Sequence, residues 1–154
     1  IIIDTVTGIR KIINDKMTKE PSSVEDILDT IGYFIEYMNG LDINFFRIVM
    51  REISSGGKYF KKIVLPNTLM PFMGIFLEAA ESLKKSNKIA DVNVLYTFFQ
   101  LVGSALYFNL LRIALKDTDL YQVVFHHGYL PEFIKNYKFI ALNGLQPKKG
   151  GIRK

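Results

Sequence analysis

The sequence of 154 residues contains no cysteine and only two histidines. The lack of cysteine excludes disulfide bonds, thiolate nucleophiles and metal sites with cysteine ligands. A packed hydrophobic core must therefore hold the fold together, and a chain of this length is sufficient for one such core. Because disulfide-free proteins are typical of reducing compartments, we expect a cytoplasmic protein.

Sequence motifs of common enzymes are also missing. The chain has no GxSxG nucleophile elbow, Walker loop, GxGxxG pattern or HExxH zinc motif. His126 and His127 are adjacent, so on a helix their side chains would point about 100° apart and would need further ligands to hold a metal. We therefore expect surface histidines, no metal, no cofactor and no enzymatic activity.

Basic residues are concentrated at the C-terminal end. The chain has 20 Lys and Arg against 15 Asp and Glu, but the last ten residues hold four of the basic ones and no acid. The remaining body has 16 basic and 15 acidic residues, a net charge of +1. Nucleic-acid-binding domains usually carry a basic stripe on the body. We expect this body not to bind nucleic acid, and residues 147–154 to form a solvated basic tail.

Apolar residues recur every three or four positions, which indicates amphipathic helices. The first such stripe predicts a helix within residues 1–19 and consists of Ile2, Val6, Ile9, Ile13 and Met17. Pro21 ends it, and Ser22 with Glu25 has the spacing of a capping box for the next helix. Because sustained alternation and strand-connecting Asn-Gly turns are lacking, we predict an all-α helical bundle formed by residues 20–146.

Prolines and caps divide the rest of the chain. Asp42 is placed to cap a third helix, and Pro131 suits the first turn of the last one. A long segment over residues 58–87 contains Pro66 and Pro71. Each proline removes a backbone donor and crowds the preceding turn, so we expect a kink or a break near both.

A run of 20 residues without charge, 92–111, is the most unusual segment. Its length would permit a transmembrane helix, and this alternative stays open. Five hydrogen-bonding side chains within it are unfavourable in lipid: Asn93, Thr97, Gln100, Ser104 and Asn109. We favour a helix buried on both faces in protein, with a second chain covering the face that its own fold leaves open.

Bulky aromatic and methionine side chains gather on three of the predicted helices. Such adaptable apolar side chains either form an ordinary core or line a cavity for an apolar ligand, and kinks at the prolines favour a cavity. Arg47 and Arg51 lie one turn apart on an apolar helix, and Arg112 follows the uncharged run. An inter-helix ion pair and a role in ligand binding explain these arginines equally well.

The order of these features resembles the C-terminal regulatory domain of TetR-family transcriptional regulators. The stretch FFRIVMRE at 45–52 looks like the family's apolar helix with an embedded arginine, and LMPF at 69–72 resembles its proline-bearing long helix. NKIAD at 87–91 matches the turn into the next-to-last helix, and FIALNGL at 139–145 fits the last helix. The family's helix-turn-helix DNA-binding head is not found in this sequence, and the segment at 1–19 looks like the connecting helix that joins this head to the regulatory domain.

The resemblance implies a homodimer in which the last two long helices of each copy form a four-helix interface, here with Val102, Leu106, Leu110, Phe133, Tyr137 and Ile140. It also implies a cavity for a hydrophobic or aromatic effector, for which we predict Phe34, Met38, Arg51, Met70, Met73, Phe76, Tyr96 and Phe99. The effector would control DNA release by the missing head. The alternative is a helical protein-interaction domain without a small ligand.

Overall fold

The computed structural model describes residues 2–17 and 21–147, without the side chains of Ile2, Ile13 and Met17. All secondary structure in this part of the chain is helical, which confirms the all-α prediction. The expected basic tail from 148 onward lies outside the described residues. The helices are α1 (Ile2–Met17), α2 (Val24–Gly40), α3 (Ile43–Ser54), the π-helix η1 (Phe60–Leu69), α4 (Met70–Lys85), α5 (Val94–Ala114), α6 (Asp119–Val124) and α7 (Tyr129–Leu145).

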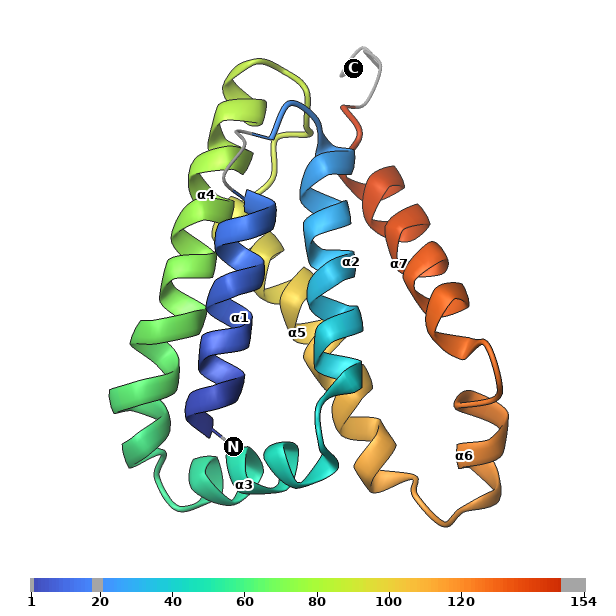
Figure 1. Cartoon of the computed structure of the whole chain (residues 1–154). Helices are drawn as coiled ribbons and strands as arrows, with labels where there is room; N and C mark the ends of the chain where they lie inside the picture. The colour runs from blue at the N-terminus through green and yellow to red at the C-terminus, as the bar shows by residue number, and fades with distance from the viewer. Residues whose placement is uncertain (1, 18–20, 148–154) are drawn as a thin grey trace.

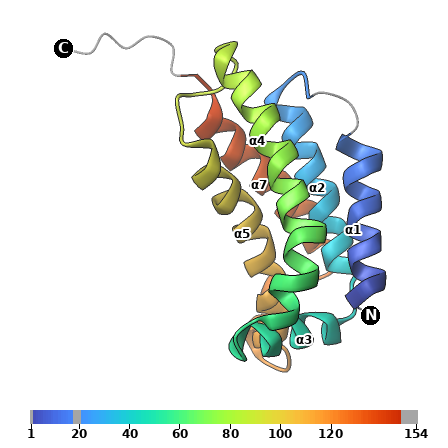
Figure 2. The same ribbon diagram turned by 90° about the vertical axis from the view of Figure 1, so that its left-hand side faces the viewer.

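Helix α2 lies at the centre of the bundle. It contacts α1, α4, α5 and α7, and all five run roughly along one axis (Figures 1 and 2). Helix α3 crosses one end of the bundle, beside the start of α1 (Figure 1). The inward stripe of α2 is therefore continuous along its length, and Ile31 and Ile35 are completely buried.

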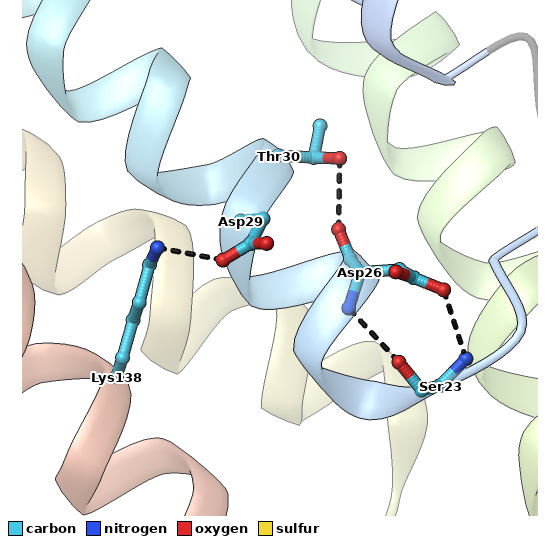
Figure 3. Close-up of polar contacts among 5 residues, drawn as sticks. All are labelled: Ser23, Asp26, Asp29, Thr30 and Lys138. Atoms are coloured by element: carbon cyan, nitrogen blue, oxygen red, sulfur yellow. Dashed lines mark hydrogen bonds and ion pairs between the residues drawn. The ribbon is translucent and has the colours of Figure 1, made fainter.

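The start of α2 shows a capping box one residue later than the sequence spacing suggested. Ser23, not Ser22, is the N-cap: its Oγ accepts from the backbone N–H of Asp26 at 3.2 Å, and the Asp26 carboxylate accepts from the N–H of Ser23 at 3.1 Å (Figure 3). Asp26 also accepts two hydrogen bonds from Ser22, and these lower the pKa of its carboxyl group. The prediction that Glu25 completes the box was wrong, because Asp26 occupies the third helical position.

Of the kink or break expected at the two prolines, a break does not occur. Helix continues from Phe60 to Lys85, but its first ten residues are wound as a π-helix that contains Pro66. Pro71 lies at the start of α4, directly after the π-helix. The side chains of Asn67 and Thr68 donate to backbone carbonyls four residues earlier, at 2.7 and 2.6 Å. The prolines therefore change the winding of the helix rather than end it.

Aromatic rings connect α2, α4 and α5 in the core. Phe72 lies between Phe34 and Phe98, with ring centroids 5.4 and 5.6 Å away, and Phe76 packs on Phe98 at 5.2 Å. These separations are typical of favourable aromatic pairs. These four rings therefore pack α2, α4 and α5 together in the core.

Helix α5 buries one side within the chain and exposes the other. Phe98, Val102 and Ala105 are buried, whereas Tyr96 and Tyr107 are 67% and 62% exposed. By length and composition alone, the 26-residue helix Phe60–Lys85 and α5 could each cross a membrane. Core helices of soluble proteins meet the same criteria of length and composition. The experiment that tests the membrane alternative is therefore whether the protein partitions into detergent.

Candidate functional site

A cavity of ≈170 Å³ lies among α1, α2, α3, η1, α4 and α5. Fifteen of its sixteen wall residues are apolar, and the other is Thr68. The walls consist of Ile9, Phe34, Met38, Phe45, Phe46, Val49, Met50, Ile53, Phe60, Val64, Thr68, Leu69, Phe72, Val102, Leu106 and Leu110. Almost every helix of the bundle thus contributes to one apolar surface, which is how ligand sites in helical bundles are built.

Helix α3 forms the wall at the end of the bundle. The carboxylate of Asp42 caps it by accepting from the N–H of Asn44 at 2.8 Å, as the sequence predicted. Its apolar residues at 45, 46, 49, 50 and 53 share one face and line the cavity. Met50 and Ile53 are nevertheless 43% and 48% exposed, so the cavity opens to solvent along the edge of α3.

The π-helix η1 supplies the opposite part of this wall. Phe60, Val64, Thr68 and Leu69 face the cavity at spacings of four, four and one. A π-helix is wider than an α-helix, and such windings are frequent at functional sites. Thr68 is 5% exposed, and its hydroxyl donates to the carbonyl of Val64. The cavity therefore has a single, buried polar side chain in its described walls.

The predicted ligand residues divide into three groups. Phe34 and Met38 line the cavity. Phe76 is buried deeper in the core beside a second, much smaller space, and Met73 is half-buried against the core. The remaining predicted residues are exposed and lie outside the cavity: Arg51, Met70, Tyr96 and Phe99.

The predicted dimer residues also divide, according to their helix. Val102, Leu106 and Leu110 turn inward and line the cavity, and Val102 is only 2% exposed. Val102 is therefore covered within the chain, whereas Leu106 and Leu110 are half-buried in the cavity wall. Phe133, Tyr137 and Ile140 line a groove of ≈430 Å³ between α5 and α7.

The groove between α5 and α7 contains a buried hydroxyl. Tyr137 is 8% exposed, and its hydroxyl oxygen has no hydrogen-bond partner among the described residues. Burial also raises the pKa of this phenol, so it stays a neutral donor. Phe133 stacks on Phe108 across the groove with ring centroids 3.6 Å apart. The groove is thus mainly apolar with one unused donor at its base.

Arg112 takes neither of the roles that the sequence left open. Its guanidinium donates to the backbone carbonyl of Asn39 in the last turn of α2, where a cation is favourable. The amide of Asn39 in turn exchanges hydrogen bonds with the hydroxyl of Tyr129 at 2.6 and 2.9 Å. This network joins α5, α2 and α7, and it lies outside the cavity walls.

The histidines match the expectation of surface residues. His126 and His127 are both exposed, and Nε2 of His126 lies 3.6 Å from a carboxylate oxygen of Glu132. Within residues 2–17 and 21–147, no group of histidine, aspartate and glutamate side chains is arranged to hold a metal ion.

Sequence reasoning missed most of the α3 and η1 wall. Phe45 and Phe46 were recognised as apolar helix residues, but nothing placed them opposite Val64 and Thr68. A usable signal was present in Pro66 and Pro71: prolines five residues apart in a continuous apolar helix favour local rewinding. The bundle around that rewound segment then leaves an apolar cavity.

Comparison with known proteins gives no match: no family model fits the chain, and neither a curated protein nor a solved structure resembles it significantly.

Proposed function

We propose that the chain is the effector-binding and dimerisation domain of a TetR-like transcriptional regulator. The observation that carries this proposal is the apolar cavity with a residue of the N-terminal helix, Ile9, in its wall. DNA binding would belong to a helix-turn-helix head that these 154 residues do not include. We expect the regulator to act in the cytoplasm as a homodimer.

The cavity chemistry favours an apolar or aromatic effector. An apolar cavity of about 150 Å³ can stay dry and bind benzene, and this cavity has a volume of ≈170 Å³. A ligand there would remove its apolar surface from water, which contributes roughly 25 cal/mol per Å² of buried surface.

The position of α1 supports control by the effector. Val6 and Ile9 are buried, and α1 packs on both α2 and η1, each of which contributes residues to the cavity wall. A ligand that binds one position of α1 better than another shifts the balance between the two. In a complete regulator, α1 would transmit this shift to the DNA-binding head, and the coupling would be reciprocal.

The outer side of α5 and the adjoining face of α7 support the dimer. Phe99 and Tyr107 on α5 and Phe139 and Ile140 on α7 are large and at least half exposed. Exposed apolar patches of this kind mark interaction surfaces. In the proposed four-helix interface these four side chains, rather than Val102, Leu106 and Leu110, would meet the second copy.

A ligand titration tests the proposed site. Toluene should raise the melting temperature of the purified chain, and the rise should grow with the logarithm of its concentration above the dissociation constant. Amide exchange should slow in α1 at the same time, because Ile9 contacts the bound ligand. A melting temperature that is independent of toluene and of other apolar probes of this size would contradict the effector site.

The alternative of a protein-interaction domain without a small ligand makes different predictions. The groove between α5 and α7 would then accept a helix of another protein, in the manner of apolar grooves that bind amphipathic helices. This alternative would be favoured if no apolar probe changes the melting temperature and the chain sediments as a monomer at micromolar concentration. A chain recovered only in detergent would instead favour the membrane protein.

A further inference from the structure

We infer that the effector is a neutral aromatic molecule with one hydrogen-bond donor, and that Thr68 accepts this hydrogen bond. The inference rests on the proposed effector site and specifies the chemical class of its ligand. Three properties of the cavity lead to it: the absence of charge in its described walls, the hydrogen-bonding state of Thr68, and the rings that surround the space.

The first step excludes a charged ligand. None of the sixteen wall residues identified in the described structure is ionisable. Arg51, which was predicted to contact the effector, is exposed and lies outside these walls. A carboxylate or an ammonium in the cavity would lose its hydration without gaining an opposite charge, which is strongly unfavourable. The ligand is therefore neutral.

The hydroxyl of Thr68 determines whether the ligand must donate or accept a hydrogen bond in the cavity. This hydroxyl donates its proton to the backbone carbonyl of Val64, with 2.6 Å between the two oxygens. A threonine hydroxyl has one donor and two acceptor lone pairs. A ligand that hydrogen-bonds this hydroxyl in its present state must therefore donate, as a phenol or an indole does and a ketone or ether does not.

The surrounding rings favour an aromatic skeleton. Five phenylalanines contribute to the cavity walls and approach it from four different elements: Phe34, Phe45, Phe46, Phe60 and Phe72. Aromatic pairs gain additional energy from edge-to-face and offset contacts beyond the burial of area. A flat ring can make such contacts with several walls at once, and a volume close to that of a benzene-binding cavity suits one or two fused rings.

Phenol and toluene provide a matched pair of probes, since they differ by a hydroxyl in place of a methyl group. Their dissociation constants are measured by calorimetry on the whole chain and on the variants Thr68→Val and Thr30→Val. Thr30 is a suitable control because it is buried, donates to a carbonyl four residues earlier at 3.0 Å, and does not line the cavity (Figure 3). Benzoate is the charged probe.

We expect Thr68→Val to weaken phenol binding about tenfold, which corresponds to about 1.4 kcal/mol, and to change toluene binding less than about threefold. Thr30→Val should change neither, and benzoate should not bind. Equal effects of Thr68→Val on both probes, or benzoate binding as tight as that of phenol, would overturn the inference and leave the effector site intact. Failure of both phenol and toluene to bind the unmodified chain would instead overturn the proposed site itself.

Discussion

The hydroxyl of Tyr37 occupies the space that a side chain at Gly8 would need. A Cβ atom on Gly8 would lie 1.8 Å from this oxygen, and the hydroxyl lies 3.4 Å from the backbone carbonyl of Thr5, to which it donates. Burial raises the pKa of Tyr37, which keeps the phenol protonated as a donor. Helices α1 and α2 thus touch at a glycine, one residue before the cavity residue Ile9.

Replacement of this glycine should loosen α1. We expect Gly8→Ala to lower the free energy of unfolding by about 1–3 kcal/mol, because overpacking forces a shift of the backbone or of the Tyr37 ring. Urea denaturation measures the change. The matched control is Gly74→Ala in α4, where a Cβ would meet no atom within 4 Å. The control should stabilise by about 0.5–1 kcal/mol, and equal effects of the two changes would contradict the close contact.

A larger side chain in the cavity should block the ligand without unfolding the protein. We expect Val49→Phe to abolish the rise in melting temperature with toluene, since the new ring occupies the same space. The free energy of unfolding should stay the same or rise by about 0.5–2 kcal/mol, as cavity-filling changes commonly do. Val123→Phe on the exposed face of α6 is the control. If toluene raises the melting temperature of Val49→Phe as much as that of the unmodified chain, toluene binds at another site.

A charge on the outer face of α7 should separate the proposed dimer. Ile140 is 62% exposed in the isolated chain, so Ile140→Asp should not disturb its fold, but a dimer would bury the aspartate. Sedimentation velocity at micromolar concentration should show a dimer for the unmodified chain and a monomer for this variant. Val123→Asp, at an exposed position outside the proposed interface, should remain dimeric. If both variants stay dimeric, another face forms the interface.

The capping box at the start of α2 should make stability depend on pH. The pKa of Asp26 is lowered from its usual 3.8 by hydrogen bonds from Ser22 and Ser23, so the folded chain favours the ionised form. Its contribution is present above pH 3.8 and is lost as the pH falls through the lower, folded-state pKa. Asp26→Asn should lower the free energy of unfolding at pH 7 by about 0.5–2 kcal/mol.

The difference between the unmodified chain and Asp26→Asn should shrink as the solution is acidified below pH 3.8. Acid and urea titrations followed by circular dichroism measure it. Glu25→Gln is the control, because it removes a carboxylate from the same helical turn and leaves the box in place. If the difference in the free energy of unfolding stays constant across this pH range, the charge of the Asp26 carboxylate does not contribute to stability.

Local sequence signals predicted where helices form better than they predicted which face of each helix is buried. Asp42 caps the helix that follows it, as expected, because a short polar side chain before an apolar run satisfies free N–H groups. The capping box moved by one residue because Ser22 and Ser23 offer two adjacent candidates, as do Glu25 and Asp26. Only the backbone conformation at the start of the helix decides which serine and which carboxylate form the capping box.

The candidate site was only partly predictable. Phe34 and Met38 belong to the strongly amphipathic α2, whose single apolar stripe must face the centre of the bundle. In α5 the apolar residues surround the whole helix, so the sequence does not say which side faces inward. Tyr96 and Phe99 were therefore assigned to the cavity and Val102 and Leu106 to the outside, and the structure places them the other way round.

By itself the amino-acid sequence determined the all-helical class, the main helix boundaries and the absence of common enzyme motifs, because these depend on periodicity, caps and residue types that are local in the chain. Tertiary structure alone decided the cavity. It joins Ile9, Thr68 and Leu110, which are far apart in sequence, and it depends on the π-winding around Pro66 and on the rotation of α5. Both result from packing against distant helices, a contribution that no short segment contains.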